Sequence, residues 1–255
     1  MPDRVLELES VSHRAWPAEE VSVLGGWLLR ATRGVTRRAN SVLPVEDPNT
    51  ENLDDALSQV REFYMHRGLP VYFQMTEASK PDGLDSFLSE RGLKRELVVD
   101  VQTSPIGRLS LGPIEVETRL DSEMSASWLA LYGAAAHYDA AQLKVRGEIM
   151  QRVQQDKVFV TALVDGDEAG VCFGVLDGTY LGIFSLVIME QYRRRGAATS
   201  MNRALARWAA DRGAQTAYLQ VEQNNAIAKR LYASLGFSTL YSYWYRTETT
   251  QLHSC

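Results

Sequence analysis

The pattern of apolar and polar positions divides the chain into alternating strand-like and helix-like segments. In the N-terminal half, two apolar runs separated by a turn at Gly34 predict a hairpin over residues 21–45. Apolar side chains then recur at helical spacing, and Gly68 is placed to end that helix. This stripe comprises Leu53, Ala56, Leu57, Val60, Phe63 and Tyr64. A strand, a short helix that ends at Gly92 and a second strand complete this half.

The C-terminal half begins after residues 104–113, whose Pro, Gly and Ser content is typical of a linker. A strand, two helical segments and three strands follow, with hairpin turns predicted at Asp165-Gly166 and Asp177-Gly178. The remaining predicted elements are a helix at 199–212, a strand at 216–223, a helix at 225–235 and a final strand at 238–246. The alternation of strands and helices predicts an α/β protein.

The two halves repeat one order of elements: hairpin, helix, strand, short helix ending in glycine, and strand. FLSERGLKRE aligns with LYASLGFSTL, which matches Gly92 to Gly236 and Leu88 to Tyr232. The first half has the acidic stretch VEDPNTENLDD where the second has MEQYRRRGAATS, and an acidic stretch should repel a phosphate. We interpret the first half as a degenerate relative of the second; an unrelated α/β domain is the alternative.

Composition and charge narrow the class of protein without naming its chemistry. The chain has 255 residues and a net charge of −5, so length allows two domains and charge does not favour nucleic-acid binding. Cys172 and Cys255 lack metal-ligand spacing and are too few for a disulfide framework. The N-terminal residues show no apolar signal core, and no apolar run approaches membrane-spanning length. These features predict a cytoplasmic protein with no membrane or nucleic-acid partner.

The stretch from Tyr180 to Trp208 carries the strongest functional signal. An apolar, strand-like run ends at Glu190, a short basic loop with one Gly and two Ala follows, and a helix begins directly after that loop. Glycine lets the backbone approach a ligand closely, and the free N–H groups and dipole of a helix start favour a phosphate. No Lys-Ser/Thr pair follows the glycine and no G-x-G-x-x-G is present, which excludes a P-loop and a dinucleotide fingerprint.

Two motifs in order give this loop a family resemblance. Arg193, Gly196 and Ala198 form R-x-x-G-x-A, and residues 221–237 read V-x-x-x-N-x-x-A-x-x-L-Y-x-x-L-G-F. Together they resemble the GNAT superfamily of acyl-CoA-dependent N-acetyltransferases, closely over 180–246 and more loosely from about residue 114. The resemblance implies an α/β fold of two GNAT-like domains, each a mixed, mainly antiparallel sheet flanked by helices. The expected boundaries are 1–103, a linker at 104–113, and a catalytic domain at 114–255.

The reaction implied by the resemblance is transfer of an acetyl group from acetyl-CoA to a primary amine by direct attack, without a metal. The acceptor could be a small molecule or a protein amine, and the protein a monomer or a homodimer. A non-catalytic acyl-CoA-binding or interaction module is the alternative. The N-terminal half could dock a protein substrate or form a wall of a small-molecule acceptor site.

The resemblance also assigns residues to the cofactor. The loop would hold the pyrophosphate mainly through backbone N–H groups; its residues are Arg193, Arg194, Arg195, Gly196, Ala197, Ala198 and Thr199. Arg193 and Arg195 can pair with phosphates, whereas Arg194 could be solvated, and a charged turn before a surface helix is the plainer interpretation. Backbone groups of Leu186, Val187 and Ile188 would pair with the pantetheine amides, although ordinary strand packing fits them too. One N–H near Leu186 or Val187 would polarise the thioester carbonyl.

The helix at 225–235 would complete the cofactor site. Asn225 and Ala228 would contact the cofactor arm, although asparagine is also a good helix N-cap. The Tyr232 hydroxyl would protonate the departing thiolate, for which an ordinary phenol pKa of ~10 is suitable. Packing on the helix face is the alternative role for Tyr232.

The base and the acceptor side are less specified. Many relatives place a Glu where this chain has Ser185, so Glu222 is the candidate base, acting directly or through water; a solvated strand end is the alternative. His137 and Tyr138 lie in the region that forms the acceptor side in relatives, and His137 could be a base or simply structural. Tyr243, in the final strand, could line the acceptor pocket.

Overall fold

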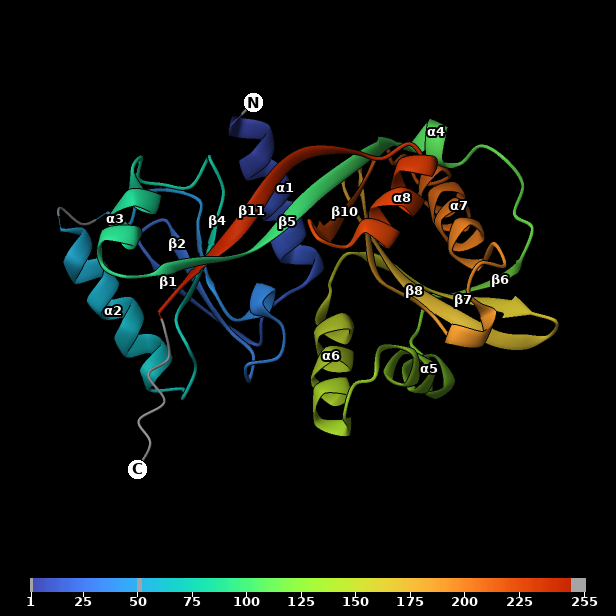
Figure 1. Cartoon of the computed structure of the whole chain (residues 1–255), viewed down its shortest axis with the longest axis horizontal. Helices are drawn as coiled ribbons and strands as arrows, with labels where there is room; N and C mark the ends of the chain where they lie inside the picture. Colours follow the sequence, from blue (N-terminus) through green and yellow to red (C-terminus); the bar gives the residue numbers. More distant parts are fainter. Residues whose placement is uncertain (1, 50–51, 249–255) are drawn as a thin grey trace. The chain divides into compact units, whose positions relative to one another are not determined.

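The computed structural model describes residues 2–49 and 52–248, so Cys255 lies outside the described residues. The described strands form a single mixed sheet, flanked by helices, in the order β1-β2-β3-β4-β11-β5-β10-β9-β8-β7-β6 (Figure 1). The predicted mixed sheet with flanking helices is confirmed, but the prediction of one sheet per half is wrong. Long-range pairing of strands leaves no trace in local sequence periodicity, so the pattern alone could not show this.

The chain divides into two compact units, which are residues 1–99 together with 241–255, and residues 100–240. Strands β5 (Lys94–Pro105) and β11 (Ser238–Thr247) each contribute residues to both units. The first unit is therefore built from two stretches that are far apart in the sequence.

The first unit contains strands β1 to β4, the start of β5 and the end of β11. Their bounds are β1 Glu20–Leu24, β2 Trp27–Ala31, β3 Val42–Pro44 and β4 Tyr72–Met75, with a 3-10 turn, η1, at Arg37–Ala39. Strands β2 and β3 are antiparallel, and Gly34 lies in the connection between them, as predicted. A second hairpin turn, which was not predicted, lies at Gly25 and Gly26 between Leu24 and its partner Trp27. A Gly-Gly pair is itself a tight-turn signal.

Helices α2 (Leu53–Met65) and α3 (Leu84–Glu90) pack on one face of this part of the sheet. Phe73 and Met75 of β4 belong to that apolar cluster. Helix α1 (Pro2–Ala15), which the sequence analysis did not predict, lies on the other face, because Gln74 between them hydrogen-bonds Glu9 of α1 at 2.6 Å.

A buried polar network lies beneath α1. Arg30 donates hydrogen bonds to Gln74 Oε1 at 2.9 Å and to Ser41 Oγ at 2.8 Å, and Tyr241 donates to Glu9 at 2.5 Å. Burial raises the pKa of the Glu9 carboxyl and lowers the pKa of the Arg30 guanidinium. Gln74 therefore links two buried, opposite charges through hydrogen bonds.

His13, one turn along α1 from Glu9, should make this unit sensitive to acid. Burial lowers the pKa of His13 from 6.5 to about 4, and the charges of Arg30 and Arg14 act in the same direction. The unfolded chain therefore binds a proton that the folded chain does not, and stability falls as the pH drops from 6.5 towards 4. Between pH 7 and pH 5 we expect the native chain to lose about 2 kcal/mol that His13→Gln does not lose.

Urea unfolding at the two pH values checks this expectation. His66→Gln is the matched control, because His66 is exposed at the end of α2. An equal loss of stability in the native chain and in His13→Gln would exclude His13 as the source.

The second unit carries the remaining strands and the helices from α4 to α8. The strands are β6 Glu117–Asp121, β7 Asp156–Val164, β8 Asp167–Asp177, β9 Tyr180–Ile188 and β10 Thr216–Glu222. The helices are α4 Ile106–Leu109, α5 Ala126–Ala136, α6 Ala140–Arg152, η2 Glu190–Tyr192, α7 Ala197–Ala210 and α8 Ala226–Ser234. Helices α5 and α6 lie on one face of β7 to β9 and α7 lies on the other (Figure 1).

The three strands predicted over residues 157–188 are confirmed as β7, β8 and β9. Their connections lie at Asp165-Gly166, as predicted, and at Gly178-Thr179, one residue later than predicted. The described residues contain no helix long and apolar enough to cross a membrane.

The stretch at 104–113, predicted to be a linker, contains helix α4. Ile106 and Leu109 are both buried in the core of the second unit. Arg203 and Arg207 of α7 hold the following residues by donating to the carbonyls of Pro113 at 2.7 Å and Gly112 at 2.6 Å. Because this stretch is rich in Gly, Pro and Ser, the sequence did not show that Ile106 and Leu109 belong to a helix.

Candidate active site

Strands β9 and β10 are parallel neighbours over only part of their length. Their pairing runs from Thr216 and Tyr180 to Leu219 and Ile183, and within the described chain it stops there. Both strands continue, β9 to Ile188 and β10 to Glu222. Residues 181–184 of β9 are buried, whereas residues 185–188 are only half-buried. Over residues 185–188, the edge of β9 that faces β10 is therefore not paired with β10.

A β-bulge lies at the start of this segment of β9. Val187 pairs with Val171 of β8 and Phe184 pairs with Phe173, so two residues of β9 face the single residue Cys172. Ser185, in the bulge, has a φ of 52°, a left-handed conformation that is uncommon for a non-glycine residue. A bulge turns the local backbone and its N–H groups away from the regular ladder. Of the two residues predicted to polarise the thioester carbonyl, Leu186 lies in the bulge and Val187 follows it.

The loop after β9 leads to an open helix start. Gly196 is the N-cap of α7 and has φ 82° and ψ −6°, a left-handed conformation that favours glycine. The first helical hydrogen bond runs from the Ser200 N–H to the Gly196 carbonyl at 3.0 Å. The N–H groups of residues 197–199 precede that bond, so the helix offers them no carbonyl. The loop therefore has the donors and the dipole that hold a diphosphate.

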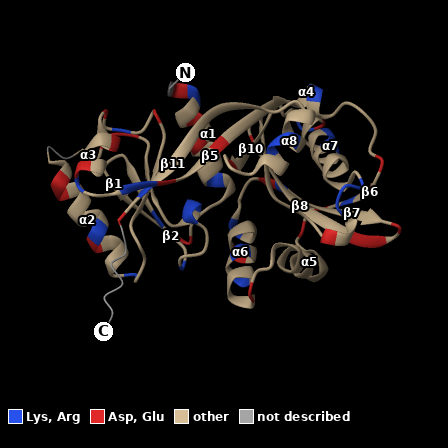
Figure 2. Ribbon diagram, in the orientation of Figure 1, with Lys and Arg blue, Asp and Glu red and all other residues tan. Residues whose placement is uncertain are grey.

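Two of the three loop arginines are bonded to the protein. Arg193 Nε donates to the Ile188 carbonyl at 3.3 Å, and Arg195 pairs with Asp165 at 2.8 Å. Asp165 lies in the acidic turn between β7 and β8 (Figure 2). Because the Arg195–Asp165 pair is exposed, it contributes only ~0–1 kcal/mol to stability. The backbone N–H groups are therefore the main anion-binding feature of the loop.

Helix α8 carries Tyr232, and Asn225 is its N-cap. Asn225 Oδ1 accepts the Ala228 N–H at 3.0 Å, so its side chain caps the helix. Tyr232 packs edge-on against Phe237, with ring centroids 5.7 Å apart. Burial raises the pKa of the Tyr232 phenol, and the thiol of Cys172 adds to the rise. Tyr232 packs against the apolar cluster that contains Cys172, the residue of β8 that faces the bulge.

The candidate base and acceptor residues are spread more widely. Glu222 is exposed at the end of β10, where its carbonyl accepts the Asn225 N–H at 2.9 Å. His137 is exposed at the end of α5 with a φ of 56°, and Tyr138 is half-buried beside it. Tyr243 belongs to the first unit, where it is 3% exposed and packs edge-on against Tyr245.

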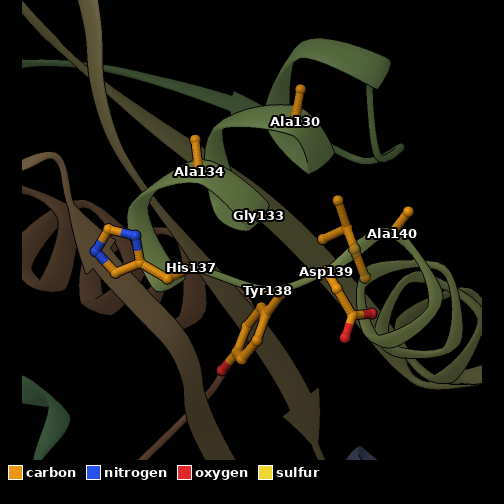
Figure 3. A pocket seen from close by; sticks show the side chains of 8 residues that line it. Ala130, Gly133, Ala134, His137, Tyr138, Asp139 and Ala140 are labelled. Carbon is orange, nitrogen blue, oxygen red and sulfur yellow. The ribbon is translucent and has the colours of Figure 1, made fainter.

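An open hollow of about 600 Å³ lies at the turn between α5 and α6. Its walls are mostly small side chains, and the rings of His137 and Tyr138 point in different directions from its edge (Figure 3). The lining residues are Ala130, Gly133, Ala134, His137, Tyr138, Asp139, Ala140 and Leu143.

Two residues beside the bulge were missed by the sequence analysis. Tyr132 of α5 accepts a hydrogen bond from Ser185 Oγ at 3.2 Å and one from Arg146 Nη1 at 3.4 Å. The Arg146 guanidinium also lies 3.9 Å from the centre of the Tyr138 ring. Ser185 could have led to them, because it occupies the position at which many relatives have a Glu. That difference was a reason to ask which residues lie beside Ser185.

Comparison with known proteins identifies the family. A family model described as "Probable histone acetyltransferase Rv0428c C-terminal" matches residues 4–246. The chain belongs to this family. It is an acetyltransferase of the GNAT superfamily, as its motifs predicted.

This GNAT acetyltransferase has a relative of similar length. This chain is 31% identical over 253 residues to "Uncharacterized N-acetyltransferase YobR" of Bacillus subtilis (strain 168). The match covers 96% of this chain and 98% of that protein.

Solved structures show the same fold at low identity. A GCN5-related N-acetyltransferase from Kribbella flavida superposes with a TM-score of 0.69 at 16% identity, over 95% of both chains. A tandem GNAT protein from the clavulanic acid biosynthesis pathway has a TM-score of 0.63 at 14% identity and covers 81% of this chain and 74% of its own. The structural relatives of this acetyltransferase thus include a tandem GNAT protein.

Proposed function

We propose that this acetyltransferase moves an acetyl group from acetyl-CoA to a primary amine by direct attack. The observation that carries the proposal is the free edge of β9 over residues 185–188, which leads directly to the open start of α7. The N–H groups of residues 197–199 would hold the pyrophosphate. Backbone groups of Leu186, Val187 and Ile188 would bind the pantetheine amides, with Asn225 and Ala228 facing the same arm.

The chemistry needs a polarised carbonyl, a neutral amine and a proton for the leaving group. The N–H of Leu186, in the bulge, or of Val187, just after it, would donate to the thioester oxygen as negative charge develops there. The amine nitrogen then bonds to the acetyl carbon as the carbon–sulfur bond breaks. Tyr232 would donate its proton to the thiolate sulfur. The phenol is protonated at neutral pH, so a proton is available, although the raised pKa makes it a weaker acid than an ordinary phenol.

The amine must lose a proton before or during attack, and Glu222 is the proposed acceptor of that proton. Glu222 lies at the end of β10 and is exposed, so it could act through water. Ser185 cannot serve as a base at neutral pH, because a hydroxyl holds its proton.

Thiol release from acetyl-CoA across a panel of primary amines tests the proposed reaction. We expect release that depends on the amine and an N-acetylated product of matching mass. The second candidate is an acyl-CoA-binding module without catalysis, which Ser185 in the position of the acid of relatives favours. Tight binding of acetyl-CoA with no release above the rate without amine would favour that module.

We also infer that residues 1–103 are a degenerate GNAT domain that precedes the catalytic domain at 114–255. Strands β3 and β4 are parallel and joined through α2, as β9 and β10 are joined through α7. The ends of α3 and α8 match as well. The Leu93 N–H bonds the Leu88 carbonyl at 3.0 Å, and the Phe237 N–H bonds the Tyr232 carbonyl at 3.0 Å.

In the part of the proposed degenerate domain that the structure describes, the start of α2 lacks the features of the phosphate loop. The N-cap of α2 is Asn52, whose side chain accepts the Asp54 N–H at 3.0 Å. Asp54 and Asp55 place two negative charges in its first turn, which would repel a diphosphate. This comparison supports a single acetyl-CoA site, in the second unit.

A further inference from the structure

Arg146 is a cation without a matching anion. Its side chain is half-buried on α6, and the part of the chain that the structure describes gives it no carboxylate partner. Its Nε is shielded from solvent without a hydrogen-bond partner, and Nη1 makes only a long bond of 3.4 Å to the neutral Tyr132 hydroxyl. Removing a guanidinium from water is costly unless an anion compensates, and a carboxylate matches its planar fork. Arg146 is therefore prepared for a ligand that the protein itself does not supply.

The position of Arg146 relates it to the proposed reaction. Arg146 Nη1 and Ser185 Oγ bind the same phenolic oxygen, that of Tyr132, at 3.4 Å and 3.2 Å. Ser185 is in the bulge, directly before the residues whose N–H groups are proposed to polarise the thioester. The Tyr138 ring, on which Arg146 stacks at 3.9 Å, borders the hollow between α5 and α6 (Figure 3). The cation therefore lies between the reacting end of the site and an open hollow.

The carboxylate of Asp139, which also lines this hollow, already has a structural role. Asp139 Oδ1 accepts the Gln142 N–H at 2.8 Å and caps α6, where the helix dipole favours its negative charge. Arg146 thus remains the side chain here that lacks an opposite charge among the described residues.

We propose that Arg146 binds a carboxylate on the amine acceptor, so that the acceptor is a small amine carrying a carboxylate group. This inference rests on the proposed acetyl transfer, whose acceptor it narrows. Tyr138 would hold the guanidinium by stacking, and Tyr132 would orient it towards the bulge. The carboxylate would then place the amine near the thioester carbonyl.

Matched pairs of acceptors and two variants test the inference. Each ω-amino acid is compared with its primary amide, which keeps the amine and the chain length but removes the negative charge. For the native chain we expect kcat/KM for the acid to exceed that for the amide by at least about 10-fold. Arg146→Gln should abolish this preference by slowing the acid alone, and Arg146→Lys should restore part of it. Lys144→Gln, at an exposed position of the same helix, should leave the preference unchanged.

The outcomes separate this inference from the proposed reaction. If acids and amides are acetylated equally by the native chain, or if the preference survives in Arg146→Gln, the role of Arg146 is wrong while acetyl transfer stands. Turnover confined to a lysine peptide with blocked ends would also overturn the inference.

Calorimetry with the coenzyme A complex decides the case in which no amine is acetylated. Acid binding that exceeds amide binding and weakens in Arg146→Gln would support the anion site on its own. Equal or absent binding of the two would overturn it.

Discussion

Replacing Gly196 with tryptophan is expected to weaken coenzyme A binding by at least about 100-fold, because hydrogen bonds from several backbone N–H groups to a charged group would be lost. The indole would stand at the start of α7, beside the N–H groups of residues 197–199. The site of the new Cβ has no atom nearer than 3.7 Å outside its chain neighbours, so the substitution should block the ligand and not the fold. Isothermal titration calorimetry with coenzyme A measures the change.

Gly83 provides a matched control for the backbone. It is the N-cap of α3 with φ 84° and ψ −1°, almost the same conformation as Gly196, and a Cβ there would meet nothing within 4 Å. Gly83→Trp should therefore carry the same left-handed strain of ~1–2 kcal/mol while coenzyme A binding stays normal. Native affinity in Gly196→Trp would contradict the assignment of the loop to the diphosphate.

Replacing Tyr232 with phenylalanine is expected to lower kcat by about 100-fold or more, the usual contribution of a positioned general acid. The ring would remain packed against Phe237, so affinity for coenzyme A should change by less than about 3-fold. The measurements are steady-state thiol release and calorimetry on the same preparation. Together they separate a lost proton donor from a damaged binding site.

Tyr180→Phe is the control for this substitution. Tyr180 begins β9 at the end far from the bulge, so its hydroxyl should not affect the reaction. A native kcat in Tyr232→Phe would reduce Tyr232 to a packing residue, and another source of the proton would have to be sought.

The order of elements in the second unit was readable from the sequence because strand and helix periods alternate clearly there. Gly196 was found through the strand–loop–helix pattern and Asn225 through the family resemblance, and the structure places both at helix starts. Helix α1 was missed, although Val5, Leu8, Val11 and Ala15 recur at helical spacing and are buried. Pro2 begins this helix and Pro17 follows shortly after its end, so proline marked its boundaries as well.

The surroundings of the bulge could not be predicted from local patterns. Ser185 and Tyr132 are separated by 53 positions in the sequence. The left-handed φ of Ser185 was not predictable either, because such a conformation is expected at glycine and not at serine. Only the three-dimensional structure shows that the Nε of Arg146 is shielded from solvent without a hydrogen-bond partner. The motifs therefore led to the proposed cofactor loop, whereas the proposed acceptor side required contacts between distant segments.

The shared strand β11 has a consequence for synthesis on the ribosome. Trp244 pairs with Met75 of β4, so the first unit obtains strand β11 only after residues 100–240 have been synthesised. While the nascent polypeptide elongates, β4 keeps one unpaired edge until residues 241–247 have emerged. Residues 100–240 emerge completely before that moment, so the later-encoded unit can fold first.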